Sequence, residues 1–114
     1  MNERTDRLAR NEAAFRMLNE RAQAVTEELA REGFGSEPES VECVCECSNA
    51  YCTAVLELRR EDYELARAGP GRFVVAPGHV DPTIEREVFD LDGAVIVEKH
   101  PGERAIAAAT DPRA

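Results

Sequence analysis

Apolar side chains near the start of the chain recur at the spacing of an α-helix. Separations of three, four and seven residues place side chains on one face of a helix. We therefore predict a helix from Asp6 to Glu32, capped at its start by Thr5 or Asp6 and ended by the segment Gly33-Phe34-Gly35. The apolar stripe of this helix consists of Leu8, Phe15, Leu18, Ala22, Val25 and Leu29, with Asn11 in its one gap.

A different pattern begins after residues 36–40, which have the composition of a linker. Polar and apolar residues alternate from Val41 to Glu46 and again from Ala54 to Leu58, which predicts two strands of a hairpin. The segment from Arg60 to Ala68 has the apolar spacing of a short helix and is followed by glycine and proline.

The rest of the chain contains further strand and turn signals. Asp-Gly favours the positive φ angles of a two-residue hairpin turn, and Asp-Pro is typical of a helix start. The tail from residue 101 is expected to be loosely ordered apart from one or two helical turns. The expected elements are a strand at Phe73–Ala76 ending in the turn Pro77-Gly78, one helical turn at Pro82–Arg86, a hairpin of Glu87–Leu91 and Ala94–Glu98 around Asp92-Gly93, and helical turns at Ala105–Ala109.

These elements predict the α+β fold class, with a long N-terminal helix followed by a small mixed or antiparallel sheet and a short helix. We expect an N-terminal amphipathic helix over residues 1–35 and a small α+β domain over residues 36–114, joined as one structural unit. The helix would be about 40 Å long at roughly 1.5 Å per residue. Such a length exceeds what so small a body easily covers, so the stripe is either internal packing or a surface for a partner or a second copy.

Composition and charge narrow the range of functions. The chain has 114 residues, no Trp and only 5% aromatic residues, so its core is thin and a cross-link would help it fold. The net charge is −9, of which −8 falls on residues 35–114. Such a surface repels phosphate, which argues against nucleic acid and anionic membranes as partners. The acidic stretches Glu61–Glu64 and Glu85–Asp92 are expected to be solvated faces. With no long apolar run, we expect a cytoplasmic protein.

The cysteines provide the clearest chemical signal. All four fall between residues 43 and 52, and three of them, Cys45, Cys47 and Cys52, have the spacing C-x-C-x4-C. On a strand, residues i and i+2 share a face about 6.6 Å apart, so two thiolates can reach one ion. Thiolates favour zinc, and a structural zinc site needs a fourth ligand. His79, just after the predicted Pro77-Gly78 turn, is the candidate.

The other candidates near this motif are weaker. Cys43 shares the strand face but lies about 13 Å along it from Cys47, too far for one ion to bind all three alternating thiolates. We predict that Cys43 is a buried small apolar residue, with a substitute-ligand role left open. Glu46 should point away from the metal, and His100 is expected to be a solvated loop residue. Inert thiols, or a redox pair, remain alternatives to the zinc site.

Several segments together resemble a family of small actinobacterial proteins. The similarity spans most of the chain, and it implies that the cysteine motif and the Pro-Gly-His turn act together, as three cysteines and one histidine of a single metal site. Cys43 and the pair Arg59-Arg60 depart from that pattern, and the resemblance implies no reaction. The matching segments are 11–21, Cys45-Glu46-Cys47-x4-Cys52, Leu56–Leu58, Asp62–Glu64, Arg72–Pro82 and Asp92–Lys99.

Three functions are compatible with these features. The first is a non-enzymatic zinc-binding module, a cytosolic interaction or regulatory protein whose long helix binds a protein partner or forms a homodimer. The second is a thiol redox or zinc-responsive switch in which Cys43 acts as the resolving thiol. The third is a zinc hydrolase, which would need an open coordination position and a general base, and the sequence offers no obvious base.

Overall fold

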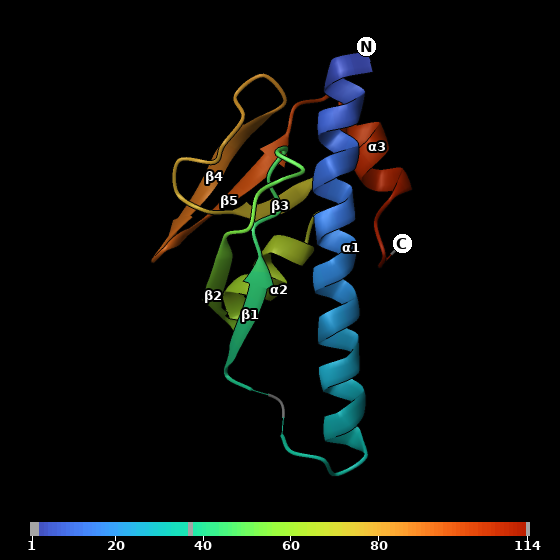
Figure 1. Ribbon diagram of the computed structural model, residues 1–114, viewed down its shortest axis with the longest axis vertical. Helices are drawn as coiled ribbons and strands as arrows, with labels where there is room; N and C mark the ends of the chain where they lie inside the picture. Colours follow the sequence, from blue (N-terminus) through green and yellow to red (C-terminus); the bar gives the residue numbers. More distant parts are fainter. Residues whose placement is uncertain (1–2, 37, 114) are drawn as a thin grey trace.

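The structure is a computed structural model that describes residues 3–36 and 38–113 and has the predicted α+β class. Glu37, in the predicted linker, lies outside the described residues. The molecule measures 47 × 27 × 24 Å, with the long helix α1 along its longest axis (Figure 1). The elements are α1 Glu3–Arg31, β1 Ser40–Val44, β2 Val55–Arg59, α2 Arg60–Arg67, β3 Arg72–Val75, β4 Glu85–Leu91, β5 Ala94–Lys99 and α3 Arg104–Ala109.

The strands form two small antiparallel sheets. β1 and β2 make the predicted hairpin, in which Cys43 lies opposite Leu56. The second sheet has the order β3-β5-β4, and the predicted Asp92-Gly93 turn joins β4 to β5 with Gly93 at φ +81. Alternate residues of β1 and β2 are buried, whereas β5 is buried along most of its length. Helix α1 contacts the second sheet through Glu12 and Arg16, and β2 of the hairpin contacts β5. One apolar cluster thus runs through both sheets.

Helix α1 packs on the body through a face other than the predicted apolar stripe. Its buried residues are Ala9, Glu12, Ala13, Arg16 and Asn19. The predicted stripe lies on the flank of the helix. Leu8 and Phe15 are half-buried there, whereas Leu18, Val25 and Leu29 are exposed at 56%, 60% and 43%. The stripe is therefore not the main internal packing surface, because polar side chains with specific partners occupy the face toward the body.

Arg16 shows how a charged residue is accommodated in that face. Its guanidinium donates to the carbonyl oxygens of Pro70 at 2.6 Å and Ala107 at 2.7 Å, and it lies 4.4 Å from the centre of the Phe73 ring. The bond to Ala107 fixes α3 against α1. The C-terminal tail is consequently more ordered than the sequence predicts, since Arg113 also pairs with Glu20 and Glu64.

Other local predictions need correction. Helix α1 begins at Glu3, so neither Thr5 nor Asp6 caps its first turn. The predicted helical turn is shorter than expected. The amides of Ile84 and Glu85 both donate to the carbonyl of Asp81 at 3.1 Å and so close a single turn, but β4 already starts at Glu85. Glu85 itself is 1% exposed and contacts Lys99, so that acidic stretch is not wholly a solvated face. The predicted stop of α1 is confirmed, with Gly33 at φ +90.

Among the described residues, no helix combines the length and the apolar character that crossing a membrane requires.

Candidate metal centre

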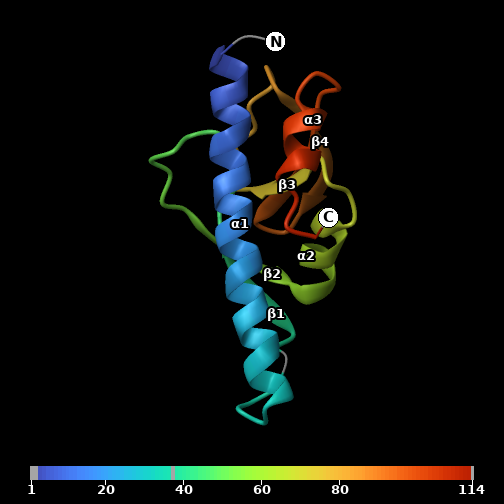
Figure 2. The same cartoon turned by 90° about the vertical axis from the view of Figure 1, so that its right-hand side faces the viewer.

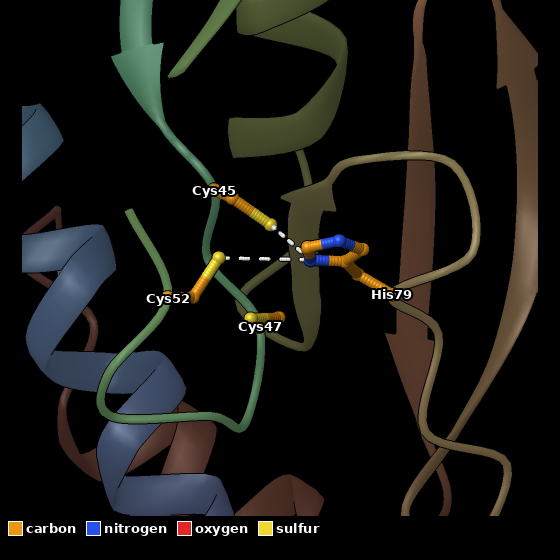
Figure 3. Close-up of side chains that lie close together, drawn as sticks. All are labelled: Cys45, Cys47, Cys52 and His79. Atoms are coloured by element: carbon orange, nitrogen blue, oxygen red, sulfur yellow. Dashed lines mark hydrogen bonds between the residues drawn. The ribbon is translucent and has the colours of Figure 1, made fainter. Parts of the chain in front are cut away.

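Three of the predicted metal ligands lie on one loop, which connects β1 to β2. Cys45 and Cys47 follow the end of β1, and Cys52 lies on the returning half of the loop. His79 comes from the second sheet, in the turn after β3 (Figure 3). The four side chains offer ligand atoms that all lie within 4.8 Å of one another. The structure therefore brings together the set predicted from the sequence.

Two distances within this cluster match the ligand spacing of a tetrahedral metal site. His79 Nδ1 lies 3.5 Å from Cys45 Sγ and 3.6 Å from Cys52 Sγ (Figure 3). Zinc bonds of about 2.3 Å to sulfur and about 2.0–2.1 Å to nitrogen, at a tetrahedral angle, separate the two atoms by about 3.6 Å. The imidazole thus presents Nδ1 to the thiols, which makes Nδ1 the nitrogen that would bind the ion.

The cluster lies at the edge of the core. Cys45 and Cys47 are buried, Cys52 is half-buried and His79 is exposed. The amide of Ala76 donates a hydrogen bond to Cys45 Sγ at 3.1 Å. An N–H donor of this kind stabilises a thiolate and orients it toward a metal.

The thiols differ in acidity in the absence of an ion. Burial raises the pKa of Cys45 and also that of Cys47. For Cys52, burial also acts upward, but the Ala54 amide and the thiols of Cys47 and Cys45 donate hydrogen bonds that leave its pKa lowered. A thiolate is the metal-binding form, so binding would release protons mainly from the two buried thiols.

Hydrogen bonds hold the cysteine loop in shape and attach it to its neighbours. The amide of Cys52 donates to the carbonyl of Asn49 at 3.1 Å, which closes the loop. Asn11 of α1, the polar residue in the predicted apolar stripe, donates to the carbonyl of Ser48 at 2.9 Å. Ser48 in turn donates from its hydroxyl to Asp81, two residues beyond His79. The loop is therefore linked both to the long helix and to the segment that carries the histidine.

The turn before His79 explains how the imidazole reaches the cysteines. The amide of His79 donates to the carbonyl of Ala76 at 3.0 Å, and Gly78 has φ +84. This left-handed conformation is accessible to glycine at little cost. The sequence prediction of a Pro77-Gly78 turn is confirmed, and the turn reverses the chain directly after β3.

Glu46 lies between two of the cysteines but faces the opposite side of the strand, as predicted. Its side chain is fully buried and accepts hydrogen bonds from Arg67 at 2.5 Å, Asn19 at 2.7 Å and the amide of Val74 at 3.0 Å. Sequence reasoning placed Glu46 away from the metal but missed these partners. The sequence carries no signal for this burial, because Glu46 falls in the same alternation as the exposed Glu42 and its partners lie on other elements.

The two remaining candidates lie outside the cluster. Cys43 is 4% exposed and packs in the apolar core, and burial raises the pKa of its thiol to about 12. The prediction of a buried small apolar residue is confirmed for Cys43. His100 is half-buried, with its Nε2 at 3.0 Å from the carbonyl oxygen of Pro82.

Comparisons with protein families, curated proteins and solved structures found no match for this chain.

Proposed function

We propose that this protein is a non-enzymatic, cytoplasmic zinc-binding module in which the metal is structural and helix α1 serves for protein interaction. The observation that carries the proposal is the convergence of three thiols and one imidazole, within 4.8 Å, from two different sheets. An ion at this position would cross-link the β1–β2 loop to the end of β3. A small domain with a thin core gains folding free energy from such a cross-link.

The donor set favours zinc over other common ions. Three thiolates and an imidazole are soft or borderline ligands, and calcium and magnesium prefer oxygen. Four ligands also complete a tetrahedron, which is the arrangement of structural zinc sites. The cytoplasm suits this chemistry because its reducing conditions keep the thiols available to the metal.

The arrangement supports a structural metal over a hydrolytic one. A zinc hydrolase needs an open coordination position and a nearby base that activates water. Glu46 is the carboxylate nearest in sequence, and its three hydrogen bonds in the core occupy it in packing. Its role is to hold Arg67 and Asn19 beside the cysteine strand.

The redox-switch alternative assigned Cys43 as the resolving thiol. Cys43 lies among Val41, Leu56 and Leu58 in the core, where burial raises its pKa to about 12. A thiol that stays protonated is a poor nucleophile for disulfide exchange. The burial of Cys43 and the raised pKa of its thiol therefore favour a permanently bound metal over a redox switch.

The net charge supports a protein partner over nucleic acid. Three thiolates with one Zn²⁺ carry a charge of −1, so the ion does not offset the −9 of the chain. We expect random single-stranded and double-stranded nucleic acid to show no shift in a gel at physiological salt. Submicromolar binding would contradict this part of the proposal.

Metal analysis of the purified chain tests the zinc site. We expect one zinc per chain, loss of that zinc in Cys47→Ser, and retention of it in Cys43→Ala, which is the matched control from the same segment. Stoichiometric zinc in a variant that lacks both Cys45 and Cys47 would overturn the proposed site.

A further inference from the structure

The lower half of α1 presents an apolar strip to solvent. The strip consists of Leu18, Ala22, Val25 and Leu29, all exposed, at separations of four, three and four residues. This is the spacing of the a and d positions of a coiled coil. The preceding members of the same series, Leu8, Asn11 and Phe15, lie along the flank where Asn11 bonds to the cysteine loop.

The two edges of this strip differ. On one edge, Asn19 is buried and bonds to Val44 and Glu46, so that edge belongs to the body. The other edge carries Arg21 and Glu28, seven residues apart and next to the strip. These residues occupy successive g positions if Leu18 and Val25 are d positions. Glu28 pairs with Arg31 of its own helix at 2.8 Å, but both side chains are well exposed, at 61% and 64%, so the carboxylate stays accessible. The free edge therefore has a positive charge in one half and a negative charge in the other.

Such an edge is complementary to itself only when two helices run antiparallel. A two-fold axis between Ala22 and Val25 places Leu18 opposite Leu29 of the second copy. In antiparallel coiled coils, g positions face g positions, so the same axis places Arg21 beside Glu28 of the second copy, twice by symmetry. A parallel pair would place Arg21 beside Thr26 and would form neither ion pair.

The cysteine loop also favours the antiparallel arrangement. The loop leaves the body beside the N-terminal half of α1 (Figure 2), where Asn11 holds it through Ser48. A parallel pair would bring two such loops to the same level. In the antiparallel pair, each Asn11 lies beyond Arg31, the last residue of the second copy's helix, so the loops do not collide.

A second apolar contact falls in the same register. Phe34 follows the end of α1, is 73% exposed, and its amide bonds back to the carbonyl of Leu29. The antiparallel register brings Phe34 to the level of a shallow groove on the second copy. That groove is lined by Arg10, Ala13, Ala14, Met17 and Thr110.

We infer that α1 binds a second copy of this chain in an antiparallel two-fold pair centred between Ala22 and Val25. The inference rests on the interaction role proposed above and names the partner. Four apolar residues on each copy make a small interface, so the dimer is reversible and forms in the micromolar range. The surface ion pairs contribute little affinity and mainly select the direction of pairing.

Sedimentation equilibrium of the full chain, with zinc measured on the same samples, tests the dimer. Between about 1 µM and about 1 mM we expect a monomer–dimer transition, and Val25→Glu should raise the dissociation constant at least about tenfold. Val55→Glu is the matched control, because Val55 is exposed to a similar extent on the outer side of β2. An equal effect of both variants, or a monomer throughout, would overturn the dimer whatever the zinc content.

Charge exchange tests the antiparallel direction. Arg21→Glu places like charges together in the antiparallel pair, and so does Glu28→Arg, so each single variant should weaken the dimer. The double variant Arg21→Glu/Glu28→Arg restores opposite charges and should recover wild-type association. If both single variants dimerise more weakly and the double variant does not recover, the antiparallel register is wrong. Single variants that dimerise like the wild type would also overturn it.

Discussion

The side chain of Glu46 connects the candidate metal site to the core. It accepts hydrogen bonds from α1 through Asn19, from α2 through Arg67 and from β3 through Val74. The neighbouring side chains in sequence, Cys45 and Cys47, point to the candidate metal. Because side chains alternate between the two sides of an extended segment, Glu46 faces the core while its two neighbours face the candidate metal.

Neutralising Glu46 should destabilise the protein. Arg67 is 2% exposed at its side chain and would keep a buried charge without a carboxylate partner. Breaking a buried pair in this way costs about 3–5 kcal/mol. We expect Glu46→Gln to lose stability on that scale in urea unfolding, whereas Glu42→Gln, on the exposed side of β1, should change it little. Equal stability of the two variants would show that the buried network is dispensable.

A second buried cluster joins α1 to the three-stranded sheet. The ammonium of Lys99 contacts the carboxylates of Glu12 and Glu85, and all three side chains are fully buried. Two carboxylates against one ammonium leave an excess negative charge. Burial, together with the charge of Asp81, raises the pKa of Glu85 from 4.5 to about 7.

The raised pKa of Glu85 predicts a pH effect on stability. Between pH 4.5 and about 7 the folded protein keeps a proton on Glu85 that the unfolded chain releases. The contribution of this proton is therefore fully present below pH 4.5 and is lost as the pH rises through about 7. At about 1.4 kcal/mol per pKa unit, the loss amounts to a few kcal/mol.

Subtracting the curve of Glu85→Gln removes the contributions of the groups that lie away from Glu85. Lys99 contacts Glu85, and burial lowers the pKa of Lys99 to about 7, so the comparison is made below that pH, where the ammonium keeps its proton. The unfolding free energy of the wild type relative to Glu85→Gln should fall across the window. The same subtraction for Glu87→Gln, an exposed residue of β4, should give a difference in unfolding free energy that does not change with pH. A difference for Glu85→Gln that does not change with pH would contradict the raised pKa of Glu85.

At the scale of elements, local sequence signals predicted the short elements and turns well but did not predict how the long helix packs. The β1–β2 hairpin, α2 and the Asp92-Gly93 turn follow from alternation, spacing and turn chemistry, which act between near neighbours. The buried face of α1 depends on distant partners. Arg16 and Asn19 are buried because carbonyls of Pro70, Ala107 and Val44 accept from them. A pattern of apolar residues alone cannot show this.

The clustering of the four candidate ligands was predictable for a similar reason. The C-x-C-x4-C spacing places three thiols on one loop, and a Pro-Gly turn places His79 at the end of a strand. The side chains of Glu46, Ser48 and Asp81 that position the site were not predictable, because their partners lie on other elements. The donors are encoded locally, whereas their supports depend on the tertiary fold.

The turn that carries His79 depends on one glycine. Gly78 has φ +84, and a Cβ there meets no atom within 4 Å, so the cost of Gly78→Ala is conformational alone. Such a change costs about 1 kcal/mol and would displace the imidazole. We expect Gly78→Ala to weaken zinc binding in a chelator competition. Gly102→Ala, which is equally open and has no positive φ, is the control.

At the scale of the whole molecule, the candidate site lies where three parts meet. The cysteine loop belongs to the first sheet and His79 to the second, and the bond from Asn11 to Ser48 attaches α1 to the same loop. A further bond, from the amide of Glu46 to the carbonyl of Val74 at 2.8 Å, joins the sheets next to the site. An ion there would add a cross-link to a junction that the shared apolar cluster and these hydrogen bonds already hold together.

Removing the metal should therefore loosen the junction and leave the ends of the molecule less affected. We expect a strong chelator to lower Tm by several degrees for each kcal/mol of lost stability. Hydrogen exchange should accelerate first in the β1–β2 loop, in the segment from Ala76 to Asp81, and in the N-terminal half of α1. The C-terminal half of α1 lies far from Asn11 and should change less.

Cys47→Ser should behave like the chelated protein and should not respond to the chelator. Uniform acceleration across the chain would instead mean that the metal stabilises the whole fold as one cooperative unit, and no change would mean that the four ligands hold no structural ion.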